Sequence, residues 1–337
     1  MLVVRPAQRD DLAGIAHLAS AQKVRVSTLP RADDRLAAKI DYSRRSFAAD
    51  PETKDRERYL FVLVDSDDGK VRGVAGIDAH AGNGQPFYNY RRDALIHASH
   101  ELGVSRPVDV LYPSHGLTGH TLLCSFMIEH SLRETDAFEL LSRTRLLFIA
   151  RHRARFANTM VVEIQGVQTE KAAVPFWDSL GRHFFNMDFG AADQYSSELS
   201  KTFIAELMPP NPIYVTLLTE AAQGALGQPH ALASATCDLL HREGFQSGCF
   251  IDIFDGGPVL EARTDTLKTV VSSHSKRVRI SEVPGDGLYL VGAGEGAGFR
   301  CVLTPLGEGL QEQARMSADV QSALGCEPGE SVLVAPL

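Results

Sequence analysis

Residues 121–145 constrain the fold of this chain more than any other part of its sequence. The apolar run at 122–128 predicts a buried strand, polar residues follow at 129–136, and apolar residues at helical spacing predict a helix at 139–152. A strand that splays from its neighbour beside a helix N-terminus leaves backbone groups and N–H donors unpaired. Such donors suit a thioester cofactor that carries a pyrophosphate. The segment therefore predicts a strand, a tight loop and a helix that together cradle this kind of cofactor.

Composition excludes several classes of protein. The 337 residues suit one large domain or a domain with an appendage, and the net charge of -8 argues against nucleic-acid binding. No apolar run reaches the roughly 20 residues that span a bilayer, and the N-terminus lacks a signal-peptide layout. The five cysteines are scattered without CxxC spacing, so we expect neither disulfides nor a metal site. We expect a cytoplasmic protein with no membrane partner.

Periodicity along the chain predicts an α/β (α+β) fold, in which helices flank a mixed twisted sheet. The opening order is strand, two helices and hairpin, and the hairpin turn is Ser66-Asp67-Asp68-Gly69-Lys70. We predict a further strand at 159–166, a short helix at 174–181, a helix that starts at Asn211-Pro212, a helix at 231–243 and a strand at 250–254.

Changes in composition predict the domain organisation. Residues 1–255 are expected to form the main domain and residues 256–337 a small β-rich module, because glycine and proline separate short β-like runs in the tail. Residues 80–120, which are rich in Gly, Pro, Tyr and His, predict an insertion of short strands and loops. Residues 190–245 predict an extended helical part.

The order of predicted elements resembles that of the GNAT acyltransferase superfamily. Two strings at the matching places add to this resemblance, Val4-Arg5-Pro6-Ala7 with Asp10-Asp11-Leu12 at the start and Phe176-Trp177-Asp178-Ser179-Leu180-Gly181 near the end of the core. Longer strings are similar to the arginine N-succinyltransferase family, and they run over essentially the whole chain. They are Tyr88-Asn89-Tyr90, Ile96-His97-Ala98-Ser99, Leu117-Thr118-Gly119, residues 203–209, Pro212-Ile213-Tyr214, Gly227-Gln228-Pro229-His230 and residues 251–258.

This resemblance implies an acyltransferase that moves a succinyl group from succinyl-CoA, its co-substrate, to the α-amine of L-arginine in bacterial arginine degradation. In the superfamily a backbone N–H of the splayed strand stabilises the oxyanion, which here points to Ser125, Phe126 or Met127. Phe126 matches a position of the family that contacts the cofactor through its main chain. His230 matches the family's proton-donor histidine, and imidazole exchanges protons near neutral pH.

Carboxylates are needed to bind arginine, because a guanidinium presents a planar fork of donors that a carboxylate meets at two points. Four acids are candidates for this role. Asp252 and Asp255 flank a strand end beside two glycines, and Glu163 and Glu206 lie within otherwise apolar runs, where an acid is costly unless paired. Each of the four could instead cap a loop or pair with a local arginine.

The chain departs from the superfamily pattern in the pyrophosphate loop. When the pattern is aligned on Arg133, Asp136 and Phe138 occupy the two positions that glycine or alanine usually fill. An aspartate there competes with phosphate for the same N–H groups, and a phenylalanine adds bulk where the cofactor lies. Arg143 and Arg145 could compensate only in part.

A loop of this kind is similar to that of the α-type chain in bacteria whose enzyme has two related subunits. We therefore expect an α subunit of an arginine (arginine/ornithine) N-succinyltransferase that assembles with a paralogous β subunit, and whose own CoA site is weak or lost. A non-catalytic structural or regulatory subunit is the alternative, and an N-acyltransferase of another amine is a third. The residues do not rank arginine against L-ornithine, or succinyl against glutaryl.

Overall fold

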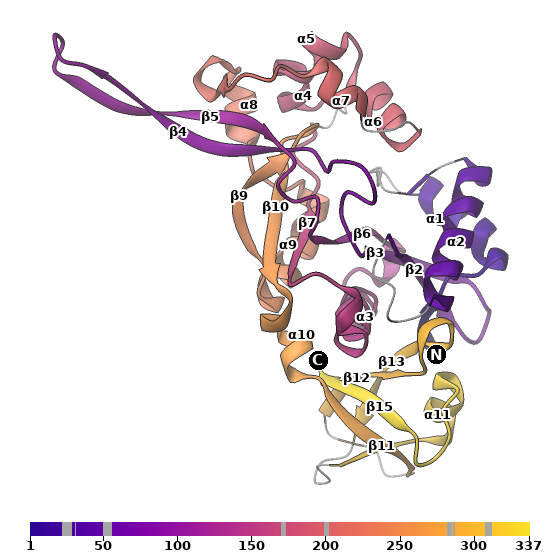
Figure 1. Ribbon diagram of the computed structural model, residues 1–337. Coiled ribbons are helices and arrows are strands. Elements are labelled where there is room, and N and C mark those ends of the chain that lie inside the picture. The colour runs from indigo at the N-terminus through magenta and orange to yellow at the C-terminus, as the bar shows by residue number, and fades with distance from the viewer. Residues whose placement is uncertain are drawn as a thin grey trace. The chain divides into compact units, whose positions relative to one another are not determined.

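The computed structural model describes residues 1–21, 29–30, 32–49, 56–169, 173–198, 202–281, 285, 287–306 and 312–337. The predicted mixed α/β fold is confirmed (Figure 1). Contacts divide the chain into two compact units, each made of separate segments. Unit 1 is Met1–His80, Thr121–Asn158 and Arg263–Leu337, and unit 2 is Ala81–His120 and Thr159–Ala262. These limits differ from the predicted domains 1–255 and 256–337, and that division stays a prediction.

Unit 1 opens with the predicted order of strand, two helices and hairpin. β1 (Leu2–Pro6) pairs antiparallel with β2 (Arg58–Asp65), β2 with β3 (Val71–Asp78), and β3 with β6 (Thr121–Ile128). α1 (Leu12–Ala21) and α2 (Asp33–Ala48) place apolar side chains one helical turn apart, which gives each helix one face for the core. Ile15, Leu36 and Ile40 are buried there with Leu60 and Val74 of the sheet.

The helix after β6 forms as predicted but begins earlier. A short turn, η2 (His130–Leu132), leads to α3 (Asp136–Arg151), whose first residue is Asp136 where residue 139 was predicted. The reason is the cap, because the Thr135 Oγ1 accepts a hydrogen bond of 3.3 Å from the Ala137 N–H. The polar residues of the loop therefore form the first turn of the helix.

The C-terminal segment adds strands to the same sheet of unit 1. β13 (Arg300–Leu306) pairs with β1, so that Val3 lies opposite Val302. Beyond β13 the sheet continues through β12 (Gly287–Ala293), β15 (Ser331–Pro336), β11 (His274–Ile280) and β14 (Gln313–Met316). The tail also contains the helices α10 (Lys268–Ser272) and α11 (Ala318–Leu324), which the sequence analysis did not predict.

Unit 2 has its own strands and core. Its strands lie in the order β7 (Thr159–Glu163), β10 (Pro258–Arg263), β9 (Gln246–Asp252), β4 (Asn89–Ser99), β5 (Val104–Ser114) and β8 (Ile213–Tyr214). The helices are α4 (Pro175–Ser179), α5 (Gly181–Phe185), α6 (Phe189–Glu198), α7 (Thr202–Leu207), α8 (Glu220–Ala225) and α9 (Ser234–Glu243). Trp177 and Phe176 lie at the centre of an apolar cluster that also holds Tyr90 and Ile251.

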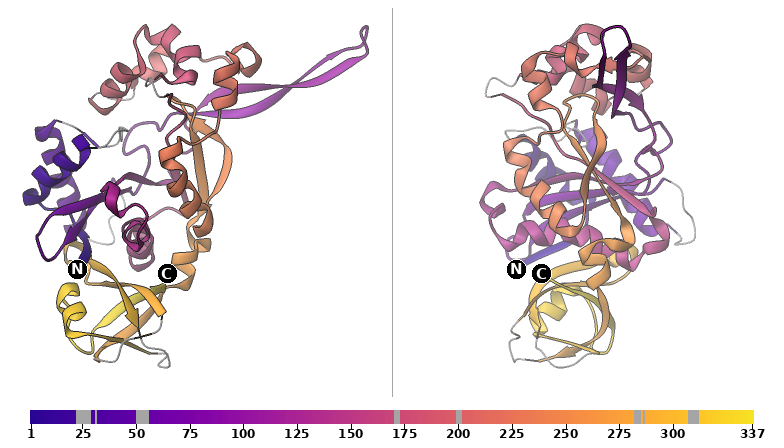
Figure 2. Two further views of the ribbon diagram at one scale, coloured as in Figure 1. Left: turned by 180° about the vertical axis from the view of Figure 1, so that it is seen from behind. Right: turned by 90° about the vertical axis from the view of Figure 1, so that its left-hand side faces the viewer.

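Two local predictions in unit 2 were wrong. The insertion was expected to carry short strands, but β4 and β5 have 11 residues each and form a long hairpin whose distal part is mostly exposed (Figure 1 and Figure 2). The helix expected from Asn211-Pro212 is absent, because Ile213 and Tyr214 pair with β5 as an added edge strand.

Among the described residues, no helix is long and apolar enough to cross a membrane.

Candidate functional site

The predicted splayed strand contains a β-bulge. Val74 pairs with Met127 and Gly76 with Cys124, so two residues of β6, Ser125 and Phe126, stand opposite the single residue between them on β3. Ser125 is 2% exposed and adopts a left-handed conformation with φ of 52°, which costs a residue with a side chain roughly 1–3 kcal/mol. Strain of this kind often marks functional sites. The predicted oxyanion donors thus lie where the regular ladder of β6 is interrupted.

Phe126 is held between two side chains of α3. Its ring meets the ring of Phe138 edge to face, with centroids 5.2 Å apart, and the Arg145 guanidinium lies 5.1 Å from its centroid. Arg145 is 1% exposed, and it donates hydrogen bonds to the backbone oxygen and the hydroxyl of Ser142. Burial lowers the pKa of Arg145 to about 10. Phe138 therefore fills space directly beside the bulge.

Arg143 and Arg145 do not face the loop as compensating cations. The Arg143 side chain is 1% exposed and donates to the Thr269 hydroxyl at 2.9 Å and to the Pro336 carbonyl at 2.8 Å. It also forms an ion pair with Glu139 at 3.3 Å. Both arginines are thus part of the interior of unit 1.

Most of the backbone donors described in the pyrophosphate loop are used by the chain itself. The N–H groups of Leu132, Arg133 and Thr135 donate to carbonyls three residues earlier, and the Phe138 N–H donates to the Thr135 carbonyl at 3.0 Å. The Ala137 N–H is bonded to the Thr135 side chain. Arg133 itself is half-buried, and its N–H to His130 oxygen distance is 3.3 Å. Five N–H groups of the loop and the first helical turn are therefore already bonded within the chain, which leaves fewer donors for a phosphate.

His230 lies on a loop of unit 2 that is fixed by backbone hydrogen bonds. Its N–H donates to the Gln165 carbonyl at 2.7 Å, and Pro229 forms a bridge with Gly166. Its ring Nδ1 accepts a hydrogen bond of 3.0 Å from the Leu232 N–H, so the neutral ring carries its proton on Nε2. Burial lowers the pKa of His230, which favours this neutral form. The ring can therefore donate a hydrogen bond from Nε2 near neutral pH.

Asp255 fixes the backbone next to the loop that carries His230, which we call the histidine loop. It is 8% exposed, and its two carboxylate oxygens accept hydrogen bonds of 2.7 and 2.8 Å from the Gly166 and Gly257 N–H groups. Burial raises its pKa well above the ordinary value, with a smaller contribution from Asp252. The Asp252 side chain closes the preceding turn, accepting from the Phe254 and Asp255 N–H groups at 2.7 and 2.8 Å. Both aspartates thus hold backbone in place.

The two predicted glutamates differ in their surroundings. Glu163, at the end of β7, accepts a hydrogen bond of 2.9 Å from the Asn89 side-chain amide. Glu206 is exposed on α7, and no ion pair or hydrogen bond among the described residues links it to the other three acids. Hydrogen bonds and strand pairing therefore connect Glu163, Asp252 and Asp255 with the His230 loop in unit 2, and among the described residues none connects Glu206 to them.

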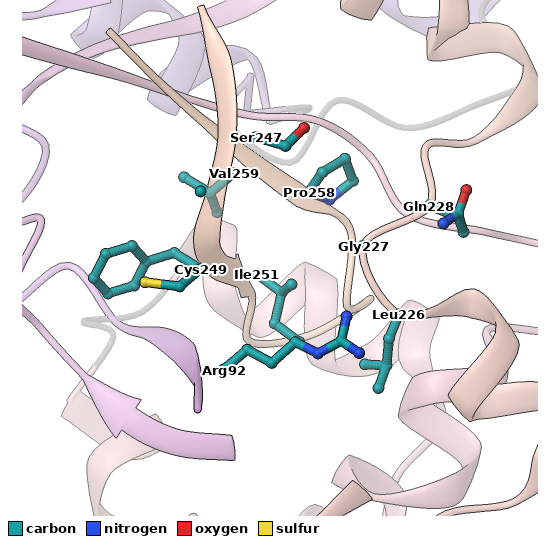
Figure 3. Close-up of a pocket in the computed structure, with 11 residues that line it drawn as sticks. Arg92, Leu226, Gly227, Gln228, Ser247, Cys249, Ile251, Pro258 and Val259 are labelled. Carbon is teal, nitrogen blue, oxygen red and sulfur yellow. The ribbon is translucent and has the colours of Figure 1, made fainter. Parts of the chain in front are cut away.

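A pocket of about 170 Å³ lies beside the same loop (Figure 3). Leu226, Gly227 and Gln228, which precede Pro229 and His230, form one side of it. Figure 3 shows the Arg92 side chain from β4 extending towards Leu226. The remaining lining comes from β9 and β10, including Ser247, Cys249, Ile251, Pro258 and Val259.

Sequence reasoning missed Arg92 and Asn89 as neighbours of this site. The available signal for Asn89 was the string Tyr88-Asn89-Tyr90, which carried the family resemblance and whose tyrosines were weighed as possible pocket residues. Ser125, Phe126, Met127 and Arg133 belong to unit 1, and the histidine and acid candidates to unit 2.

Comparisons with known proteins identify the family. The family described as "Arginine N-succinyltransferase beta subunit" matches residues 2–269, and its C-terminal domain matches residues 274–336. "Arginine N-succinyltransferase subunit alpha" of Pseudomonas aeruginosa is 44% identical over 333 residues, which cover 98% of each chain. "Arginine N-succinyltransferase" of Yersinia pestis is 38% identical over 349 residues, covering 100% of this chain and 98% of the other.

A solved structure agrees with this result. It is described as arginine/ornithine succinyltransferase subunit AI from Pseudomonas aeruginosa, and it superimposes with a TM-score of 0.93 at 40% identity, covering 100% of this chain and 98% of that chain. Both the sequence relatives and this structure span nearly the full length. The chain therefore belongs to the arginine N-succinyltransferase family of acyltransferases.

Proposed function

We propose that this protein is the α-type subunit of an arginine N-succinyltransferase, which transfers the succinyl group of succinyl-CoA to the α-amine of L-arginine. The observation that carries the proposal is full-length identity of 44% to a subunit named alpha. A relative named subunit beta is 38% identical over 285 residues, which supports a partner of the same family. The cytoplasm remains the predicted location.

We assign roles to the site residues from their geometry. Under this proposal the Nε2–H of His230 donates to the oxyanion or the leaving sulfur, and the hydrogen bond from the Leu232 N–H to its Nδ1 supports this tautomer. Backbone N–H groups at the bulge, among Ser125, Phe126 and Met127, are the second candidates for the oxyanion. Glu163 and Asp252 give this part of unit 2 the negative charge that a cationic substrate requires, while Asp255, whose pKa is raised by burial, holds the backbone beside them.

The loop before α3 supports a weak or lost CoA site in this subunit. Five of its N–H groups bond within the loop, Asp136 stands at the helix start, and Phe138 packs against Phe126. Under this proposal the β-type subunit binds most of the CoA. The protein alone should release little thiol from succinyl-CoA with arginine, and addition of the β-type subunit should restore turnover. Robust turnover by the protein alone would refute the weak CoA site and leave the family assignment intact.

The competing function is a non-catalytic subunit that serves assembly or regulation. His230→Ala separates the two functions, because only a catalytic α subunit loses activity through its own histidine. We expect the two-subunit preparation to lose at least about 100-fold in kcat with this variant, as is usual for a lost hydrogen-bond donor to the oxyanion. Unchanged activity of the complex would favour the assembly role. Ornithine and glutaryl-CoA in the same assay test the choice of amine and acyl group.

A further inference from the structure

Asn89 is a buried polar residue with an unused acceptor. It is 0% exposed, and its side-chain Nδ2 donates to the Glu163 carboxylate at 2.9 Å. Its Oδ1 is buried and receives no hydrogen bond from any residue that the structure describes. A buried acceptor without a donor costs about 1–3 kcal/mol, so such atoms call for an explanation. A hydrogen-bond donor on a bound ligand would provide such an explanation.

Asn89 and Glu163 lie close to the histidine loop within unit 2. Glu163 is two residues before Gln165, whose carbonyl accepts the His230 N–H at 2.7 Å. Asn89 stands opposite Asp252 in the β4–β9 pairing, and directly opposed residues of antiparallel strands share a face. Asn89 Oδ1 and the Glu163 carboxylate thus belong to the same part of unit 2 as the loop that carries His230, the proposed hydrogen-bond donor.

In this tautomer, the imidazole ring of His230 has no nitrogen available to accept a proton from the substrate. The α-ammonium of the substrate must lose a proton before its nitrogen can attack a thioester. His230 Nε2 already carries hydrogen, and Nδ1 is engaged by the Leu232 N–H at 3.0 Å. A different acceptor is therefore required, and it must also attract a cation. A carboxylate meets both needs.

We propose that Asn89 and Glu163 form the subsite for the α-ammonium group of the amine substrate, and that Glu163 takes its first proton. This rests on the proposed function. An ammonium has three donors, which can be shared between the carboxylate and the Asn89 Oδ1. After deprotonation the nitrogen forms the C–N bond, the C–S bond breaks, and the second proton lost by nitrogen leaves with the sulfur as thiol. The guanidinium end of the substrate binds elsewhere.

The test uses the active two-subunit preparation with Glu163→Gln, which keeps the shape of the side chain. We expect kcat to fall about 100-fold or more and the acidic limb of its pH profile to flatten, because the amide cannot accept a proton. Asn89→Ala should raise KM for arginine about tenfold, as expected for one lost hydrogen bond to a charged group. Glu261→Gln, which changes another half-buried glutamate of unit 2, is the matched control and should resemble wild type.

Ligand binding separates this subsite from a guanidinium site. Calorimetry without the thioester should show arginine binding weakened by Glu163→Gln, while Nα-acetylarginine, whose α-amine is blocked, should be unaffected by the substitution. Equal weakening of both ligands, or a Glu163→Gln enzyme with the kcat and pH profile of wild type, would overturn the inference. Thermal melting shows whether each variant is folded. A wild-type preparation that does not succinylate arginine would instead refute the proposed function, and arginine binding then still tests the subsite.

Discussion

Asp255 is the side chain whose removal should have the largest structural effect near the histidine loop. It is 8% exposed and accepts two buried N–H groups, from Gly166 and Gly257. In Asp255→Asn the amide can accept only one of them, and its NH₂ faces the other. At least one backbone donor and the new amide donor then lose partners, each at about 1–3 kcal/mol, so we expect a loss of about 2–6 kcal/mol.

Urea unfolding and amide hydrogen exchange measure this prediction. The free energy of unfolding should fall by that amount, and exchange at Gly166 or Gly257 should accelerate roughly 30-fold or more, since 1.4 kcal/mol corresponds to a factor of ten. Asp265→Asn is the control, because that carboxylate is 67% exposed in its ion pair with Arg153 and should matter little. Wild-type stability and exchange in Asp255→Asn would refute the view that this carboxylate holds the segment together.

Two further substitutions test other parts of the fold. Burial of His152 lowers its pKa from 6.5 to about 4, so the folded protein favours the neutral imidazole. The contribution of this neutral histidine to the free energy of unfolding is therefore complete above pH 6.5 and is lost as the pH falls towards 4. His152→Gln should remove roughly 2 kcal/mol of the difference in the free energy of unfolding between pH 7.5 and pH 5, measured by urea unfolding. Gly256 has φ of 69°, and an added Cβ would lie 2.9 Å from Phe176 Cγ, so Gly256→Ala should lower the stability by about 1–2 kcal/mol or more. In thermal melts Gly119→Ala, with open space around it, should resemble wild type, and equal melting of the two alanine variants would contradict the steric argument.

Sequence periodicity predicted the elements that have one buried face. The strand at 122–128 and the helices around Leu36 and Leu140 were predicted because their apolar residues recur at the period of the element. The hairpin of β4 and β5 was underestimated, since both sides of its distal part are exposed and charged residues such as Arg91, Arg92 and Asp93 break the alternation. Exposed strands carry little of the pattern that identifies buried ones.

The site was predicted in part, and the reason is the same for each gap. His230 and Glu163 were identified by residue type and by resemblance, and the structure places them near each other. The hydrogen bonds that fix Asp255 could not be foreseen, because they join residues separated by 89 positions in the sequence. The Asn89 contact spans 74 positions. Contacts of this kind depend on tertiary pairing, which local sequence does not encode.

The pairing of β1 with β13 has a consequence for synthesis of the chain. Val3 leaves the ribosome early, but its partner Val302 is made roughly 300 residues later, or about 15–60 s at ordinary translation rates. During that time one edge of β1 lacks its neighbour, and an unpaired strand edge is a template for association with other chains. Fragments that end before residue 300 should thus be prone to aggregate, and a molecular chaperone that shields this edge would raise the yield of folded protein.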